Sequence, residues 1–153
     1  MKIISHRGNL SGKDIFRENK IFAIEECIDL GFDVEVDLWY LNGELYLGHD
    51  EPEIHIQSKF LLSNSETLWI HAKNFLAVDW LFSKPLNWFW HKTDEMTLTS
   101  KGIPWCYPDN YLSSGITVLT EDVEIPQKVY GICTDNPLRY QHEKFRTNLS
   151  INN

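Results

Sequence analysis

The apolar and polar positions near the N-terminus predict a strand, a helix and a second strand. Residues 2–5, with Ile3 and Ile4 at their centre, indicate a short buried strand that ends at His6. From Asn19 onward, apolar residues recur at the i,i+4 spacing of a helix, and Gly31 ends that helix. Residues 32–38 alternate between apolar and acidic side chains, which is the pattern of a strand. This order of elements favours a parallel βαβ unit.

The pattern after residue 38 predicts shorter elements. Asn42-Gly43 lies between two apolar runs and is a strong signal for a tight hairpin, so residues 44–48 should run back along the second strand. The remaining pattern predicts a short helix over 75–82, another after Tyr140, and strands at 68–73, 87–91, 96–99, 103–107, within 112–120 and at 130–134. These strands follow one another so closely that full helices hardly fit between them.

This succession favours an α/β fold. The predicted architecture is a reduced (β/α) barrel of the TIM type, with several connecting helices shortened or missing. The chain has 153 residues, which corresponds to one domain, so residues 1–153 are expected to form a single barrel domain. A typical barrel of this type takes about 250 residues, so this one would be unusually small.

Composition and charge exclude several classes of protein. The formal net charge of −8 argues against nucleic-acid binding, and it means that an anionic substrate would need a local cationic site. No apolar run approaches the roughly 18 residues of a membrane span, and the N-terminus lacks the apolar stretch of a signal peptide, which predicts a cytoplasmic protein. The cysteines are far apart and form no Cys-x-x-Cys pair, so neither a zinc knuckle nor a disulfide framework is expected. The oligomeric state stays open.

Glu35 and Asp37 are the first candidates for chemistry. Residues two apart on a strand face the same side, so the two carboxylates should project together. They repel each other unless a cation lies between them, and their hard oxygen ligands suit Mg²⁺, Ca²⁺ or Mn²⁺. The alternative is a solvated strand face with both carboxylates in water.

His6 and Arg7 directly follow the first strand. In α/β folds the carboxyl ends of strands carry the functional sites. The planar fork of Arg7 suits phosphate oxygens, and His6 can give or take a proton near neutral pH. The alternative is a capping histidine beside a surface salt bridge.

His49 should return to the same neighbourhood through the hairpin. An ideal two-residue hairpin would pair His49 with Val36, on the face opposite the carboxylates. We therefore expect a bulge, or an end to the pairing near Gly48, that turns His49 toward Glu35 and Asp37.

The ordered set of these motifs resembles the glycerophosphodiester phosphodiesterase family, within the barrel superfamily that includes phosphatidylinositol-specific phospholipases C and sphingomyelinase D. The residues that carry the resemblance are Ser5-His6-Arg7-Gly8, Glu18-Asn19, Glu35-Val36-Asp37, Asn42-Gly43, Gly48-His49-Asp50 and the closing strand 131–137. The resemblance covers the first third of the chain and its last strand.

The resemblance implies roles for seven residues. His6 and His49 match a general base and a general acid, Glu35 and Asp37 match metal ligands, and Arg7 matches a phosphate contact. A third strand in that family carries Glu-x-Lys, and here it reads Ile70-His71-Ala72-Lys73. Lys73 fits the second phosphate contact, whereas His71 replaces the acid.

The replacement bears on the metal. An imidazole in that position removes one negative charge and moves the preference toward Mn²⁺, Zn²⁺ or another transition metal. Alternatively, His71 only packs, and two carboxylates plus water hold the ion. We therefore expect one divalent metal ion, Mg²⁺, Ca²⁺ or Mn²⁺, with Zn²⁺ added because of His71.

These inferences predict a metal-dependent phosphodiester hydrolase that acts on glycerophosphodiester-like small molecules. Two alternatives stay open, namely a lyase that forms a cyclic phosphate and a catalytically silent module that binds phosphorylated ligands. His91 and Asp94 could line the mouth of the pocket, although solvent-facing side chains are the favoured interpretation. Trp105 is interpreted as barrel core, and the alternative is a contact with the leaving group near a strand end.

Overall fold

The computed structural model describes residues 1–108, 110–125 and 128–141. The first three elements are the strand, helix and strand that the sequence predicts. In chain order the elements are β1 (Lys2–His6), α1 (Ile21–Asp29), β2 (Asp33–Leu41), β3 (Glu44–Leu47), β4 (Ile54–Ile56), α2 (Ser58–Ser63), β5 (Leu68–Ala72), α3 (Phe75–Phe82), β6 (Trp88–Phe89), β7 (Met96–Leu98), β8 (Pro104–Cys106), β9 (Ile116–Leu119) and β10 (Gly131–Thr134).

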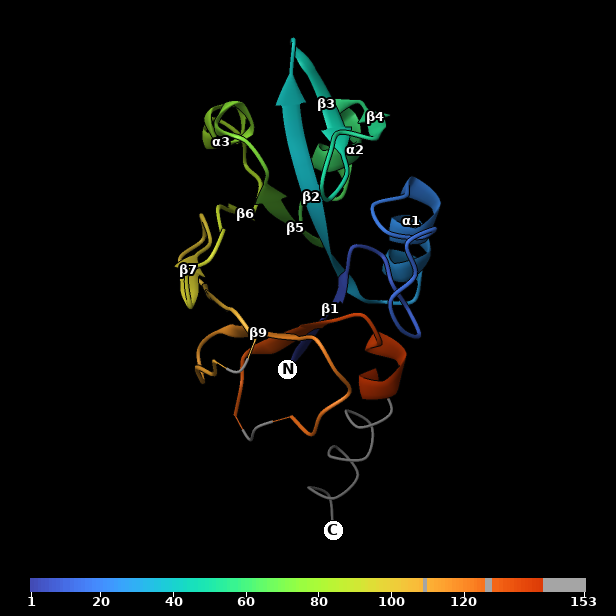
Figure 1. Cartoon of the computed structure of the whole chain (residues 1–153), viewed down its shortest axis with the longest axis vertical. Coiled ribbons are helices and arrows are strands. Elements are labelled where there is room, and N and C mark those ends of the chain that lie inside the picture. Colours follow the sequence, from blue (N-terminus) through green and yellow to red (C-terminus); the bar gives the residue numbers. More distant parts are fainter. Residues whose placement is uncertain (109, 126–127, 142–153) are drawn as a thin grey trace.

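All of these strands belong to one sheet, in which β2 pairs with three other strands. The sheet order is β4-β3-β2-β1-β10-β9-β8-β7, with β5 paired to β2 and β6 paired to β5. The start of β2 pairs in parallel with β1, and its end pairs antiparallel with β3. Its other edge pairs in parallel with β5. Figure 1 shows that the sheet is curled, with α1 on one side and α3 on the other.

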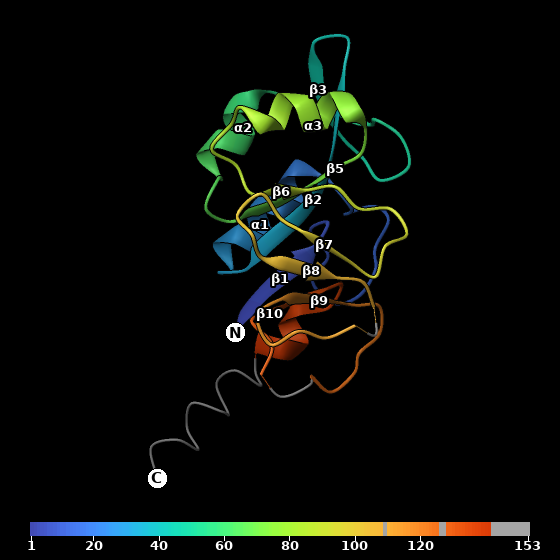
Figure 2. The ribbon, with the colours of Figure 1, turned by 90° about the vertical axis from the view of Figure 1, so that its left-hand side faces the viewer.

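The prediction of a reduced (β/α) TIM-type barrel is wrong. The sheet is mixed, because β3, β4 and β7 run antiparallel to their neighbours, and it forms a half-barrel with few helices instead of alternating β/α units. The short connections explain the difference. Residues 107–115 join β8 to β9, which is fewer than the dozen or so residues that a helical crossover takes. Helices α2 and α3 instead gather near the end that carries the β2–β3 hairpin (Figure 2).

Alternation along β2 separates two cores. Val34 and Val36 lie in the larger cluster of buried apolar side chains, to which α1 contributes Ile24 and Cys27. The opposite face of the sheet carries a smaller, aromatic cluster, made of Ile4, Trp69, Phe89, Trp105, Ile116 and Cys133. Because side chains alternate across a strand, the acidic residues of β2 share this inner face.

Several predicted elements differ in extent. The strands predicted at 87–91, 96–99 and 103–107 shorten to β6, β7 and β8, and neither β4 nor α2 was predicted. The helix predicted after Tyr140 lies, apart from Gln141, outside the described residues. Within the part of the chain that the structure describes, no helix has the length and apolar character needed to cross a membrane.

Gly48 ends the β2–β3 pairing, as the sequence predicts. The ladder runs from Leu41 opposite Glu44 to Leu38 opposite Leu47 and stops there. Gly48 has φ +155°, and a Cβ at this position would overlap the carbonyl oxygen of Glu51. The chain therefore turns at a position that only glycine accommodates, which releases the following residue from the ladder.

We predict that Gly48→Ala lowers the free energy of unfolding by more than about 2 kcal/mol, because the new methyl group adds a backbone clash to an unfavourable φ. Urea denaturation measures the change. Gly43→Ala is the matched control, since Gly43 has φ +86° but open space around it, and it should cost about 1 kcal/mol. Equal losses in the two variants would contradict the proposed overlap.

Candidate metal centre and active site

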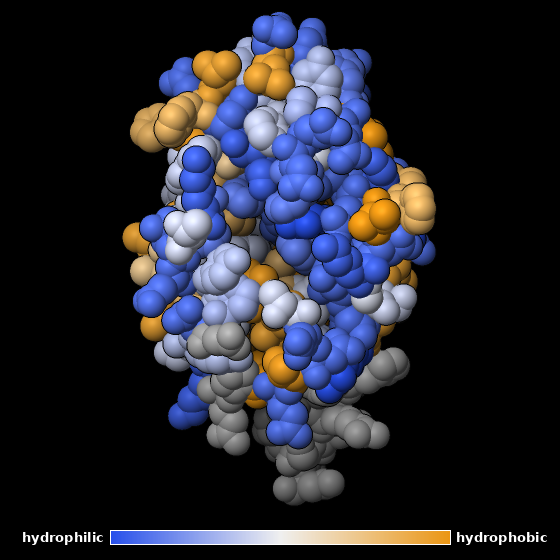
Figure 3. Space-filling view, in the orientation of Figure 1, coloured by the Kyte–Doolittle hydropathy of each residue, from blue (hydrophilic) through white to orange (hydrophobic). Residues whose placement is uncertain are grey.

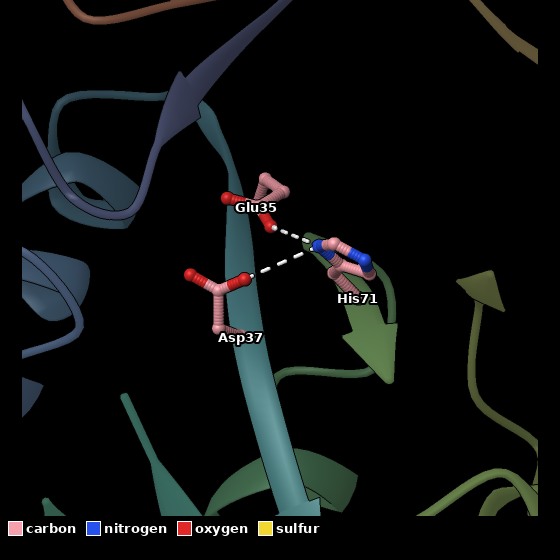
Figure 4. Close-up of side chains that lie close together, drawn as sticks. All are labelled: Glu35, Asp37 and His71. Atoms are coloured by element: carbon pink, nitrogen blue, oxygen red, sulfur yellow. Dashed lines mark ion pairs between the residues drawn. The ribbon is translucent and has the colours of Figure 1, made fainter. Parts of the chain in front are cut away.

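Three candidate ligands meet on the inner face of the sheet. Glu35 and Asp37 project from β2 and His71 projects from β5, where it is the register partner of Asp37. Figure 4 shows the three side chains pointing toward one another. His71 Nδ1 lies 3.2 Å from Asp37 Oδ1 and 3.9 Å from Glu35 Oε1, and one ligand atom from each residue lies within 4.8 Å of the others.

The two carboxylates are buried and unevenly satisfied. Glu35 is 2% exposed and Asp37 is 0% exposed. Glu35 Oε2 has no hydrogen-bond partner among the described residues, whereas Asp37 Oδ1 lies 3.2 Å from both His71 Nδ1 and Lys73 Nζ. Burial and the charge of Asp37 raise the pKa of Glu35 above its ordinary value. Burial would also raise the pKa of Asp37, but hydrogen bonds from His49 and His71 outweigh it and hold that pKa well below its usual range. The negative charge of Glu35 is therefore less well offset by hydrogen-bond donors and cations than that of Asp37.

The orientation of His71 is the most informative feature of the cluster. Its Nε2 lies 2.9 Å from the backbone carbonyl oxygen of His91, so Nε2 carries a hydrogen and donates it. If Nδ1 carried no proton, its lone pair would face the carboxylate oxygens and repel them. A cation, either a proton on Nδ1 or a metal ion, has to lie between them. A histidine whose second nitrogen donates to a carbonyl is the usual arrangement of a metal ligand.

His6 stands beside this cluster at the end of β1. Its Nδ1 donates a hydrogen bond to Asp135 Oδ1 at 2.8 Å, and its Nε2 lies 3.9 Å from Glu35 Oε2. Burial by itself lowers the pKa of His6, but the hydrogen bond with Asp135 and the charge of Glu35 raise it more, so the pKa lies above its ordinary value. His6 thus keeps a fixed ring orientation, with Nε2 toward the carboxylates.

His49 approaches from the opposite side. Its Nδ1 lies 3.3 Å from Asp37 Oδ2, and its Nε2 accepts a contact of 3.4 Å from the Arg7 guanidinium. With 38% of its side chain exposed, His49 is the more accessible of the two histidines. The expectation that the hairpin turns His49 toward the carboxylates is confirmed.

The two predicted phosphate contacts both lie against carboxylates. Arg7 Nε is 3.0 Å from Asp37 Oδ2, and its Nη1 donates to Glu18 at 3.2 Å. Lys73 Nζ is 3.2 Å from Asp37 Oδ1. The structure thus brings all seven predicted residues together, and their cations and anions form one network centred on Asp37.

The sequence interpretation missed two residues that fix this network. The side-chain amide of Asn19 donates to Asp37 Oδ2 at 3.0 Å and accepts from the Asp37 backbone N–H at 2.9 Å. Asp135 orients His6 and also accepts from Asn9 at 2.8 Å. Asp135 follows the last strand directly, so the reasoning about strand ends that identified His6 could have identified it. Asn19 belongs to the Glu18-Asn19 motif of the resemblance, but the sequence does not indicate its partner, because the contact with Asp37 depends on the path of the loop after β1.

His91 was interpreted as solvent-facing, and that interpretation is wrong. The residue is only 9% exposed, and it lines the cavity beside the cluster. Burial and the nearby His71 lower the pKa of His91 below its ordinary value. The imidazole therefore forms part of the wall of the candidate site.

A cavity of about 550 Å³ adjoins the cluster. Figure 3 shows that this face of the molecule is hollowed near its centre, with hydrophilic residues gathered on the α1 side. A second cavity of about 590 Å³ shares His6, Arg7 and His49 with the first. The residues that line the first cavity are His6, Arg7, Glu35, His49, His71, Ala72, Lys73, Phe89, Trp90, His91, Lys92, Trp105, Tyr107, Pro108, Val118 and Thr120.

Compared with known proteins, the chain matches no family model, no curated protein and no solved structure. Functional inference therefore depends on the geometry of the site and on the motifs themselves.

We predict that Asn19→Gly destabilises the protein by roughly 2–4 kcal/mol, because it removes two buried hydrogen bonds from Asp37. Glycine is the appropriate substitute since Asn19 has φ +59°, so backbone strain does not contribute to the loss. Thermal and urea unfolding measure the effect. Stability within about 0.5 kcal/mol of the parent protein would show that Asp37 does not depend on Asn19.

Proposed function

We propose that this chain is a metal-dependent phosphodiester hydrolase acting on glycerophosphodiester-like small molecules, the activity that its motifs' resemblance to the glycerophosphodiester phosphodiesterase family implies. The observation that carries the proposal is the position of His71 Nδ1, which faces Asp37 Oδ1 at 3.2 Å while Nε2 is engaged by a backbone carbonyl. Glu35 also has a buried carboxylate oxygen, Oε2, without a hydrogen-bond donor among the described residues. Such a donor set calls for a cation.

Glu35, Asp37 and His71 would hold one divalent metal ion. Two carboxylates and an imidazole suit Mn²⁺ and Zn²⁺ as well as Mg²⁺ and Ca²⁺. Bound there, the ion supplies Lewis-acid polarisation of a phosphoryl oxygen and offsets the charge of the transition state. The remaining steps belong to side chains of this chain.

His6 and His49 perform the proton transfers. The Nδ1 of each ring lies against a carboxylate, Asp135 for His6 and Asp37 for His49, so Nε2 would be the nitrogen that transfers protons. For His49 this requires the contact between Nε2 and Arg7 to open. One histidine removes the proton from the attacking water, and the other protonates the leaving alkoxide. His6 ends β1 and His49 lies in the loop after β3, so the two rings reach the cluster from different segments, which suits transfers on opposite sides of a phosphorus atom.

Arg7 and Lys73 bind the phosphate. Both side chains line the cavity, and both also contact Asp37. Lys73 shares Asp37 Oδ1 with His71, so it would give up this contact when that oxygen binds a metal cation. Its ammonium group would then be available to a phosphate oxygen. Competition for one carboxylate oxygen thus couples metal binding to substrate binding.

We expect metal-stripped protein to regain hydrolysis of bis(p-nitrophenyl) phosphate and of glycerophosphodiesters when a divalent ion is added back. His6→Ala should lose about 10²–10⁴-fold in kcat, because proton transfer contributes that much. Glu35→Ala should lose metal-dependent turnover. His55→Ala is the matched control, since His55 lies on the surface and contacts Glu44, and it should retain full activity.

Turnover that survives in His6→Ala or Glu35→Ala would contradict the assigned roles. Absence of turnover with any ion in folded protein would overturn the proposal in favour of a silent phosphate-binding module. A stable cyclic phosphate among the products would instead identify a lyase.

We further predict that His71→Glu shifts metal preference from Mn²⁺ and Zn²⁺ toward Mg²⁺ and Ca²⁺, because a third carboxylate replaces the imidazole. Titration calorimetry with each ion measures the order of affinities. An unchanged order would mean that His71 is not a ligand.

A further inference from the structure

We infer that the aromatic end of the cavity is the binding site for the leaving alcohol, that His91 is its polar contact, and that the alcohol is a neutral hydroxylated group such as a polyol or a sugar. This inference rests on the proposed phosphodiesterase function. It adds the chemical class of the group that leaves.

The cavity has two chemically different ends. One end carries His6, His49 and His71, the carboxylate Glu35 and the phosphate contacts. At the other end, Phe89 stacks on Trp105 with ring centroids 4.4 Å apart, and Tyr107 is 49% exposed at the rim. Because His71 stacks on Phe89 at 5.0 Å, the aromatic wall begins directly beside the candidate metal ligands. A group attached to the phosphorus would extend along this wall, where its C–H groups can pack on the half-exposed ring of Tyr107 and on the edges of Phe89 and Trp105.

His91 is the polar element of this wall. Its ring lies 5.1 Å from that of Tyr107 and 6.4 Å from that of His71, measured between centroids. Neither ring nitrogen has a hydrogen-bond partner among the residues that the structure describes. Buried polar atoms without partners are unfavourable. A small turn of the ring toward the cavity that it lines would let a ligand hydroxyl pair with one of them, since imidazole can donate and accept.

Charge selects against cationic alcohols. The described lining includes the cations Arg7, Lys73 and Lys92, whereas Glu35 at the metal end is its one carboxylate. Lys92 lies over the ring of Trp90, with its Nζ 5.4 Å from the centroid, and so occupies the aromatic face that a quaternary ammonium group would use. A choline headgroup would therefore meet positive charge, whereas a neutral polyol would meet hydrogen-bonding groups and ring faces.

The test compares two substrates that share glycerol 3-phosphate and differ in the alcohol, glycerophosphoinositol and glycerophosphocholine. Released glycerol 3-phosphate gives kcat/KM for each. We expect the inositol ester to be favoured by about tenfold or more, and His91→Phe to reduce that ratio about tenfold, because a site built around a hydroxyl discriminates through its unpaired polar groups. The backbone carbonyl that orients His71 is retained in this variant.

Three further variants make the result specific. His91→Gln keeps a donor and an acceptor and should retain most of the preference. His55→Phe, a histidine outside the cavity, should leave the ratio unchanged. Should His91→Phe fail to fold, Tyr107→Leu tests the aromatic wall at a half-exposed position, and it should also reduce the preference. An equal rate on both esters, or a ratio unaffected by the cavity variants, would overturn the inference while leaving the hydrolase intact. Absence of turnover on both esters and on bis(p-nitrophenyl) phosphate would overturn both.

Discussion

Repulsion between two buried carboxylates is the constraint around which this structure is organised. Alternation along β2 puts Glu35 and Asp37 on the same inner face, where both are almost inaccessible to water. Burying two negative charges side by side is costly unless cations or hydrogen-bond donors offset them. The structure meets this cost unevenly, because donors and cations gather on Asp37 while an oxygen of Glu35 has no donor among the described residues. The imbalance gives the physical basis for a bound metal ion.

The scaffold serves this cluster through the ends of its strands. β1 delivers His6 beside Glu35, β5 delivers His71 beside Asp37, and β10 is followed by Asp135, which orients His6. The β2–β3 hairpin returns His49 because Gly48 ends the ladder at the required point. A half-barrel with few helices is sufficient to hold these residues together, since the parallel strands whose ends carry them are neighbours in one sheet. Phe89 and Trp105 belong to the aromatic core on the inner face of the sheet and also line the cavity. The same side chains therefore contribute to core packing and to the proposed ligand selection.

The sequence predicts local structure and the composition of the site better than the architecture. Period-two alternation in β2, the Asn42-Gly43 turn and the need for a break at Gly48 can all be read from neighbouring residues. The barrel prediction was wrong because strand spacing does not reveal strand direction, and the β7–β8 pair is antiparallel. Asn19 and Asp135 escaped notice for a related reason, since their partners are 18 and 129 residues away in the chain.

The most direct test of the central claim is anomalous diffraction from crystals grown or soaked with Mn²⁺ or Zn²⁺. A single anomalous peak coordinated by Glu35, Asp37 and His71 Nδ1, with Lys73 displaced from Asp37 Oδ1, is the predicted result. A map without a peak at this position at saturating metal, in which Lys73 and Arg7 keep their contacts with Asp37, would contradict the account. The cluster would then be a closed ionic network that has no need of a metal ion.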